Sequence, residues 1–273
     1  MDDKMGKTIQ FTKMHGAGND YIYVNVMDYP LENPSELAIR WSVPHFGIGA
    51  DGLILIDKSD KADFKMRMFN SDGSEGKMCG NGARCIGKYV YDKGLTDKTT
   101  VSLETLAGIK ELQLKVQDGV ATEVTVDMGA PKIGNPALIV EASGQTFIGT
   151  EVSMGNPHLV IFVDDVNAID LPVVGPLIEK NPLFPEGVNV EFVQVRNPED
   201  VRMRVWERGS GITMACGTGA CATVVAGAYN GKTKQNANVE MDGGTVNILW
   251  DKETGDVFKT GGAAIVFEGT ISI

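Results

Sequence analysis

A motif recurs in this chain at an interval of 137 residues (216 − 79), which is half of its length of 273 residues. The letters CGNGA at 79–83 return as CGTGA at 216–220, and GN at 18–19 returns at 155–156. Gly94 and Gly231, which close the two segments, keep the same interval. Several matches in one register indicate an internal duplication. We therefore expect two copies of one fold unit, related by a pseudo-twofold axis.

The two halves are predicted to contain the same elements in the same order. Runs of β-branched and aromatic residues between turns indicate strands, and helical spacing of apolar residues follows each CG motif. In the first half we expect helices from Ser35, the expected N-cap, to Val43 and from Gly80 to Gly94, and strands at 10–14, 21–27, 53–57, 64–70, 99–106, 109–116 and 120–128. In the second half we expect a helix at 217–230 and strands at 159–163, 188–195 and 202–206. The predicted fold class is α+β (α/β), with two pseudosymmetric domains that each roll a mostly antiparallel sheet around a central helix.

Composition excludes several classes of function. The net charge of −11 and the pI of about 4.8 argue against nucleic acid or an anionic membrane surface as a partner. No apolar run approaches the roughly 20 residues of a membrane span, and the first residues lack the apolar segment of a secretory signal. Four cysteines are too few for a disulfide scaffold. We expect a globular protein of the reducing cytoplasm, with no nucleic acid and no membrane as partner.

Each repeat places a cysteine where a helix is expected to begin. At that point free backbone N–H groups and the positive end of the helix dipole favour a thiolate and bind a carboxylate. Two thiols related by a pseudo-twofold axis would approach one substrate from opposite sides. One thiol would remove an α-proton and the other would deliver a proton to the opposite face, which is the chemistry of a racemase. The candidate catalytic residues are Cys79 and Cys216.

Simpler interpretations apply to other residues. A single cysteine at a helix start is more often a small buried hydrophobe, but its duplication together with the glycines favours a function. Cys85 and Cys221 do not keep the interval, so we assign them to the core. The chain lacks C-x-x-C, Walker A and G-x-G-x-x-G motifs, and its histidines form no ligand-spaced group, so we expect no metal, redox or nucleotide site. For His15 and His158 we predict structural hydrogen bonds.

Six polar residues adjoin the repeated motifs in turns or at strand ends: Asn19, Asn70, Asn156, Asn189, Glu207 and Arg208. A single asparagine in a turn usually only stabilises the turn, through a hydrogen bond from its side chain to the local backbone. The two halves differ, however, because the first has Asn70-Ser71 where the second has Glu207-Arg208. An ion pair on one side of a symmetric site indicates a zwitterionic amino acid held in one orientation. A ligand that is zwitterionic at both ends would carry two amino-acid groups.

Six segments resemble the diaminopimelate epimerase family in order along the whole chain: KMHGAGNDYIYVN (13–25), GIGADGLILI (47–56), FNSDGSEGKMCGNGARC (69–85), MGNPHLVIF (154–162), GVNVEFVQV (187–195) and VWERGSGITMACGTGACA (205–222). The resemblance implies an isomerase that interconverts LL- and meso-2,6-diaminopimelate in lysine and peptidoglycan biosynthesis. It implies that this epimerase uses no cofactor and is PLP-independent. It also implies a small-molecule amino-acid substrate as the partner and a homodimer as the assembly.

The resemblance also assigns residues. Cys79 and Cys216 are the two implied bases. The implied substrate-binding residues are Asn19, Asn70, Asn156, Asn189, Glu207 and Arg208, with Gly80, Asn81, Gly217 and Thr218 at the carboxylate. In the family fold the C-terminal strand returns to the first domain. We therefore expect one domain over 1–120 with 265–273, and the other over 121–264.

Two positions depart from the family pattern. Many members have Glu where this chain has Ile212, and some have Gln where Gly52 stands. Two alternatives remain open at this point. One is a thiol-dependent racemase of another amino acid from the same superfamily. The other is a non-catalytic amino-acid-binding protein, which would keep its function without the two thiols.

Overall fold

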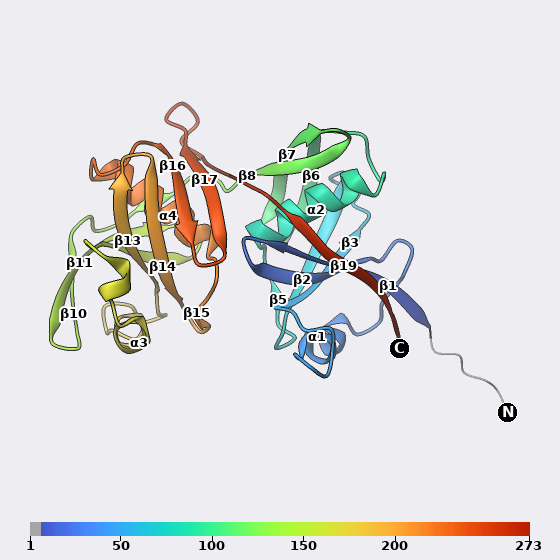
Figure 1. The fold of residues 1–273 in the computed structure, drawn as a ribbon, viewed down its shortest axis with the longest axis horizontal. Helices are drawn as coiled ribbons and strands as arrows, with labels where there is room; N and C mark the ends of the chain where they lie inside the picture. Colours follow the sequence, from blue (N-terminus) through green and yellow to red (C-terminus); the bar gives the residue numbers. More distant parts are fainter. Residues whose placement is uncertain (1–6) are drawn as a thin grey trace. The chain divides into compact units, whose positions relative to one another are not determined.

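The computed structural model describes residues 7–273, which divide into two compact units (Figure 1). The first unit holds the described residues through Val126 together with Gly262–Ile273, and the second holds Asp127–Gly261. The last strand, β19 (Ala264–Ser272), pairs antiparallel with β1 (Thr8–Gly16), so the end of the chain extends the sheet of the first unit. No helix of the described residues is long and apolar enough to cross a membrane.

The second unit does not have the predicted limits of 121–264. Strand β8 (Val120–Asp127) pairs antiparallel with β7 (Gly108–Gln117) as far as Val126, and this pairing keeps β8 in the first unit. At the other end, the backbone carbonyl of Gly262 accepts a hydrogen bond of 3.4 Å from Arg84 of the first unit. Strand pairing therefore moves the start of the second unit to Asp127. The contact with the buried Arg84 places Gly262 in the first unit, so the second unit ends at Gly261.

The first unit contains two helices, α1 (Pro34–Ser42) and α2 (Gly80–Asp92). Its other strands are β2 (Asn19–Asn25), β3 (Gly52–Asp57), β4 (Phe64–Asn70), β5 (Glu75–Gly76) and β6 (Thr100–Thr105). The strands pair in the order β19, β1, β2, β3, β4, β6, β7, β8. All of these pairs are antiparallel except β2–β3 and β4–β6, which are parallel. This sheet-dominated mixture confirms the α+β class.

The N-cap of α1 differs from the prediction. Asn33 occupies the N-cap with a φ of 50°, and Pro34 follows at the first helical turn. Ser35 lies inside the helix, and its hydroxyl donates a hydrogen bond of 2.7 Å to the carbonyl of Gly73. The prediction was wrong because proline, whose φ suits a helix and whose missing N–H is not needed there, begins the helix earlier.

The second unit repeats the plan of the first. Its helices are α3 (Leu171–Glu179), α4 (Gly217–Tyr229) and a short 3₁₀ helix, η1 (Val166–Ala168). Its strands are β9 (Lys132–Ile133), β10 (Leu138–Ala142), β11 (Gln145–Ser153), β12 (Pro157–Phe162), β13 (Asn189–Asn197), β14 (Asp200–Glu207), β15 (Gly211–Ile212), β16 (Asn236–Met241), β17 (Gly244–Trp250) and β18 (Val257–Gly261). They pair in the order β10, β11, β12, β13, β14, β16, β17, β18, and the parallel pairs are β12–β13 and β14–β16.

The duplication extends to the register of the strands. In the first unit Ile22 of β2 lies beside Leu53 of β3. In the second unit the residues 137 positions later, Leu159 and Val190, form the equivalent parallel pair. The interval also relates α1 to α3 and α2 to α4. The internal repeat in the sequence therefore corresponds to a repeated fold unit.

Helices cover both faces of the central strands in each unit. In β3, Leu53 packs in one apolar cluster with Trp41 of α1, while Ile54 lies against Gly82 of α2. Successive residues of a strand point to opposite faces, so a strand covered on both sides is apolar throughout. In the second unit α4 contacts strands from β11 to β18, which places this helix at the centre of its sheet.

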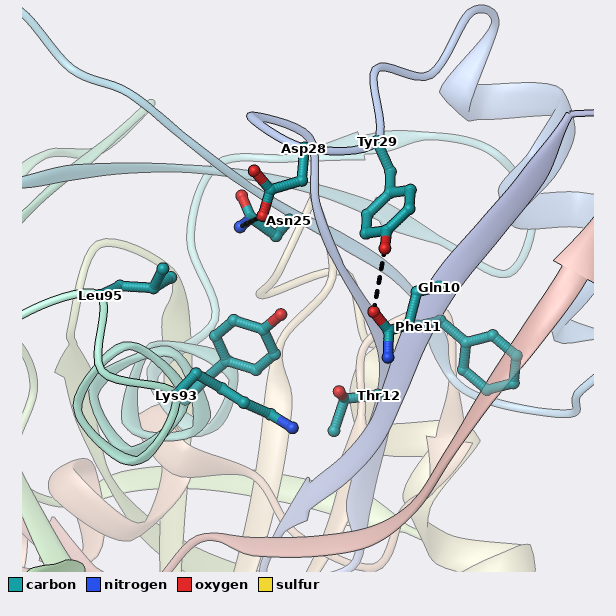
Figure 2. A pocket seen from close by; sticks show the side chains of 9 residues that line it. Gln10, Phe11, Thr12, Asn25, Asp28, Tyr29, Lys93 and Leu95 are labelled. Carbon is teal, nitrogen blue, oxygen red and sulfur yellow. Dashed lines mark hydrogen bonds between the residues drawn. The ribbon is translucent and has the colours of Figure 1, made fainter.

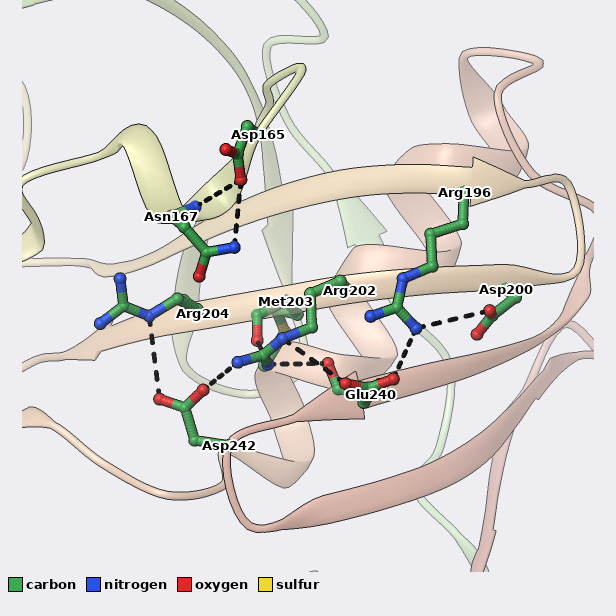
Figure 3. Close-up of polar contacts among 9 residues, drawn as sticks. All are labelled: Asp165, Asn167, Arg196, Asp200, Arg202, Met203, Arg204, Glu240 and Asp242. Atoms are coloured by element: carbon green, nitrogen blue, oxygen red, sulfur yellow. Dashed lines mark hydrogen bonds and ion pairs between the residues drawn. The ribbon is translucent and has the colours of Figure 1, made fainter.

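A network of charged side chains connects β13, β14 and β16 (Figure 3). Arg202 donates hydrogen bonds to the carbonyls of Met203 at 2.7 Å and Glu240 at 3.2 Å, and it pairs with Asp242. Arg196 pairs with the Glu240 carboxylate at 2.5 Å. These contacts join β13 and β14 to β16 and to the turn that follows β16.

Candidate active site

The thiol of Cys79 lies at the start of α2. Cys79 is the N-cap of this helix with an extended φ of −126°, and its sulfur accepts a hydrogen bond from the Gly82 N–H at 3.4 Å. The thiol donates to the Asn19 side-chain oxygen at 3.3 Å. Asn19 is the first residue of β2, and the two-residue turn before it, Ala17-Gly18, has positive φ at both positions, as a type I′ hairpin requires. The hairpin thereby brings Asn19 to the helix start.

A chain of polar contacts holds Asn19. Its side-chain oxygen also accepts from Asn81 at 3.3 Å, and its amide donates to the Asp51 carboxylate at 2.6 Å. Arg84, which is fully buried, donates to the Asn81 side chain at 3.0 Å. Burial raises the pKa of Asp51, although the hydrogen bond from Asn19 opposes that shift. Asp51 and Arg84 were missed in the sequence because neither belongs to the repeated pattern.

The thiol of Cys216 has the equivalent position in the second unit. Cys216 is the N-cap of α4 with a φ of −111°, and its sulfur accepts from the Gly219 N–H at 3.4 Å. The hydroxyl of Thr218 lies 3.6 Å from the sulfur and accepts a hydrogen bond of 3.2 Å from the Asn156 amide. Asn156 and Thr218 thus stand where Asn19 and Asn81 stand in the first unit.

The expected thiolate character does not hold for Cys216. Burial raises the pKa of this thiol well above its usual range, and the negative charges of Glu207 and Glu191 raise it further. The hydrogen bonds from Thr218 and from the Gly219 N–H act in the opposite direction. The helix start therefore has the predicted influence on the thiol, but desolvation and two carboxylates outweigh it.

A buried histidine and glutamate adjoin this second thiol. His158 Nδ1 lies 2.7 Å from a Glu191 carboxylate oxygen, and both side chains are fully buried. The other ring nitrogen of His158 contacts the Asn156 side-chain oxygen at 3.1 Å. Structural hydrogen bonds were predicted for His15 and His158, and His15 accepts one from the Gly18 N–H at 3.3 Å. Both predictions are confirmed, whereas Glu191 was missed because it lies in an apolar strand without a motif.

Glu207 and Arg208 point to different partners. The Glu207 carboxylate accepts a hydrogen bond from Thr213, and burial raises its pKa. Arg208 donates from its backbone to the Asn189 side chain at 3.0 Å and from its guanidinium to the Glu186 carbonyl at 3.0 Å. In the part of the chain that the structure describes, the predicted ion pair between Glu207 and Arg208 is not formed. The two residues lie on either side of a strand end, where adjacent side chains diverge.

The remaining candidate, Asn70, ends β4 and donates to the Ser74 hydroxyl at 3.0 Å. Its partner across the sheet is Gly52, where a Cβ would lie 2.1 Å from the Phe69 carbonyl oxygen. Any side chain at position 52 would therefore have to displace the backbone. Ile212, the other departure from the family pattern, is 42% exposed in β15.

Each unit thus gathers its own share of the predicted residues. In the first unit Asn19 and Asn81 meet at Cys79, and Asn70 has its contacts in the turn after β4. In the second unit Glu207, Gly217 and Thr218 adjoin Cys216, and Asn156 contacts Thr218. Asn189 and Arg208 contact each other. The second cysteine of each helix, Cys85 or Cys221, is fully buried, which confirms its assignment to the core. Burial raises the pKa of Cys85 to about 11.

The fold is that of the PhzF proteins and amino-acid epimerases. A PhzF-family phenazine biosynthesis protein from Bacillus anthracis aligns with a TM-score of 0.73 at 19% identity, over 98% of this chain and 100% of that one. A hydroxyproline epimerase from Agrobacterium vitis aligns with a TM-score of 0.73 at 15% identity, over 100% of this chain and 94% of that one. At such identities the likeness shows the fold alone.

Sequence similarity gives the family. The family model of diaminopimelate epimerase matches residues 11–134 and 150–266. A diaminopimelate epimerase of Parabacteroides distasonis is 65% identical over 98% of this chain and 100% of its own length. One from Acetivibrio thermocellus is 52% identical over 97% of this chain and 99% of its own length. The chain belongs to the diaminopimelate epimerase family, and it is therefore an isomerase.

Proposed function

We propose that this protein interconverts LL- and meso-2,6-diaminopimelate by proton transfer at one α-carbon, with no cofactor. The observation that carries the proposal is the repeated placement of a thiol at the N-cap of a central helix, Cys79 in one unit and Cys216 in the other. Inversion at a carbon needs a base on one face and an acid on the other, and each unit supplies one thiol for these roles. Names of similar proteins over the whole chain support this substrate.

In this mechanism the Cys216 thiol is the proton donor in the forward reaction, which converts the LL isomer to the meso isomer. Burial and the nearby carboxylates raise its pKa, so Cys216 is protonated at neutral pH. Cys79 is the acceptor once its own S–H proton, which otherwise faces Asn19, has passed to solvent. The C–H bond of the substrate then breaks as its proton passes to the Cys79 thiolate. The S–H bond of Cys216 breaks as its proton passes to the opposite face of the same carbon. In the reverse reaction the two thiols exchange roles.

The charge that develops on the substrate during proton removal is spread onto its α-carboxylate. The first residues of each central helix, Gly80 and Asn81 or Gly217 and Thr218, present backbone N–H groups without helical partners. We assign these groups to the carboxylate, because preorganised donors stabilise developing negative charge. Binding of the remaining substrate groups we assign to six polar side chains: Asn19, Asn70, Asn156, Asn189, Glu207 and Arg208.

The proposal also includes a homodimer in the cytoplasm, where a reducing environment would keep both thiols free. Its support is β19, where Val266 and Phe267 are 54% and 45% exposed. Exposed apolar side chains on a strand are typical of contacts between copies of a chain. Sedimentation of the wild type should give a dimer and Val266→Lys a monomer, whereas a monomeric wild type would contradict the assembly.

A direct assay tests the activity. Reduced protein without added cofactor is incubated with LL-diaminopimelate, and the isomers are separated by chromatography. We expect the meso isomer to accumulate to equilibrium, with no turnover of proline, glutamate or other single amino acids. Turnover of one of those amino acids instead would favour a racemase of different specificity. Binding without turnover of any of them would favour an amino-acid-binding protein.

A further inference from the structure

A pocket of about 240 Å³ lies in the first unit (Figure 2). Its walls are β1, the turn after β2 and the C-terminal end of α2. Cys79 is the N-cap of α2 and Lys93, in the pocket, is its C-cap. A helix of 13 residues is about 20 Å long, so the pocket is well separated from the proposed chemistry. No step of the proposed mechanism uses these residues.

One wall of the pocket carries a fixed carboxylate. The side chain of Asn25, which is 5% exposed, donates to the Asp28 carboxylate at 2.7 Å and accepts from the Met27 N–H at 3.2 Å. The neighbouring Tyr29 hydroxyl donates to the side-chain oxygen of Gln10 at 3.0 Å. These contacts hold the acidic group and its polar neighbours in place before any ligand arrives, which lowers the entropic cost of binding.

The other wall carries an exchangeable ion pair. Lys93 pairs with Glu268 of β19, which lies directly opposite Thr12 of β1. Their side chains are 34% and 40% exposed, and ion pairs at that exposure contribute little to stability. A ligand carboxylate can therefore replace Glu268 on Lys93 at little cost, which leaves Glu268 available for a ligand ammonium group.

The charges around the pocket are unequal. Two carboxylates, Asp28 and Glu268, stand against the single ammonium group of Lys93. Tyr89 lies among these groups, and burial raises the pKa of its hydroxyl, with the negative charges of Glu268 and Asp28 adding to the shift. The Tyr89 hydroxyl thus remains a hydrogen-bond donor, and the pocket has one positive group and an excess of negative charge.

We propose that this pocket binds a free amino acid that carries a second amino group. The carboxylate of the ligand would pair with Lys93, its α-ammonium group with Glu268 and its distal ammonium group with Asp28. This arrangement pairs each of the three charges of Asp28, Lys93 and Glu268, which neither a neutral nor an acidic amino acid does. The site is separate from the proposed epimerase site, and its occupancy does not depend on that activity.

The probe is L-lysine, added to the ¹⁵N-labelled full-length protein while amide signals are followed by NMR. A ligand of this size at common ligand efficiency binds with a dissociation constant of about 1 mM. We expect saturable shifts for residues of the pocket and none for the segments of Cys79 or Cys216. L-Norleucine, which keeps the chain length but lacks the second amino group, should bind at least about tenfold more weakly, and L-glutamate should not bind.

Two variants and a matched control locate the site. Asp28→Asn and Lys93→Met each remove one charged group from an exposed position, and each should weaken L-lysine binding at least about tenfold. Asp60→Asn, in the exposed loop after β3, changes the net charge like Asp28→Asn and should bind as the wild type does. Three results would overturn the proposal: no saturable shifts, shifts confined to the thiol segments, or equal binding by all three variants.

Discussion

Glu191 occupies in the second unit the position that Ile54 occupies in the first, 137 residues earlier. Each side chain lies against the third residue of a central helix. A Cβ on Gly82 would lie 2.6 Å from Ile54 Cδ1, and one on Gly219 would lie 2.6 Å from Glu191 Oε1. A methyl group thus adjoins one helix start and a carboxylate adjoins the other. The duplicated fold is chemically asymmetric at its two thiols.

Removal of the Glu191 charge should lower the pKa of Cys216. Glu191→Gln keeps the size of the side chain and removes one of the two negative charges that disfavour the thiolate. In a Cys79→Ala background, we expect Cys216 to react faster with iodoacetamide at every pH below its own pKa, because the thiolate is the reactive form. Peptide mass spectrometry over a pH series measures the rate.

Glu179→Gln is the matched control for this experiment. Glu179 is a buried carboxylate of the same unit, but it accepts hydrogen bonds from Trp206 and the Gly209 N–H. Removal of the Glu179 charge should leave the pH dependence of Cys216 alkylation unchanged. Equal acceleration in both variants would mean that loosened packing, and not the charge of Glu191, controls the thiol.

Replacement of either N-cap thiol should abolish most of the turnover. In Cys79→Ser and Cys216→Ser the hydroxyl is a far weaker base than a thiol, so we expect a loss of about 10²–10⁴-fold in the rate of epimerisation. Cys85→Ala, which changes a fully buried thiol of the same helix as Cys79, should keep its turnover. If either serine variant turned over like the wild type, that thiol would have no part in the chemistry.

A side chain at position 52 should destabilise the first unit. A Cβ on Gly52 would lie 2.1 Å from the Phe69 carbonyl oxygen, so Gly52→Ala must shift β3 against β4 at a cost of about 1–3 kcal/mol. At Gly262 the nearest atom to a Cβ is a carbonyl oxygen at 3.8 Å, and Gly262→Ala should be close to neutral. Urea denaturation measures both variants, and equal stability would contradict the predicted clash.

The two arginines of the charged network on β13, β14 and β16 should contribute unequally to stability. Arg202 is 15% exposed and donates to two backbone carbonyls, so Arg202→Met should lower the free energy of unfolding by about 1–3 kcal/mol. Arg196 is 40% exposed, and Arg196→Met should have no measurable effect. Thermal unfolding of the two variants separates them, and a larger loss for Arg196→Met would refute this assignment.

The repeat in the sequence predicted more of the fold than local propensity did. Strand β3 and helix α2 were predicted within one or two residues, because apolar runs, turn residues and Gly94 define them. Helix α3 and strands β10 and β11 were missed. The interval of 137 residues relates α3 (Leu171–Glu179) to α1 (Pro34–Ser42) residue by residue. Its two prolines conceal a helix that the repeat alone would have located.

Site residues that belong to a sequence motif were predicted. Site residues that only tertiary packing brings to the thiols were missed. The N-cap positions of Cys79 and Cys216 are confirmed, since glycines and helical spacing mark them. The charge environment of Cys216 was not predictable, because Glu191 reaches it from an apolar strand. The sum of desolvation and distant charges depends on tertiary structure, and no local pattern contains it.

The most direct test of the two-thiol account is the fate of the α-hydrogen in D₂O. Reduced protein converts LL-diaminopimelate for a small fraction of the approach to equilibrium, and both isomers are examined by mass spectrometry and proton NMR. Because one thiol removes the hydrogen and the other, exchanged with solvent, delivers a deuteron, the meso product should carry one deuterium at the inverted carbon. The recovered LL isomer should carry almost none. A meso product that retains the original hydrogen, or an LL isomer that gains deuterium before the meso product forms, would contradict the account.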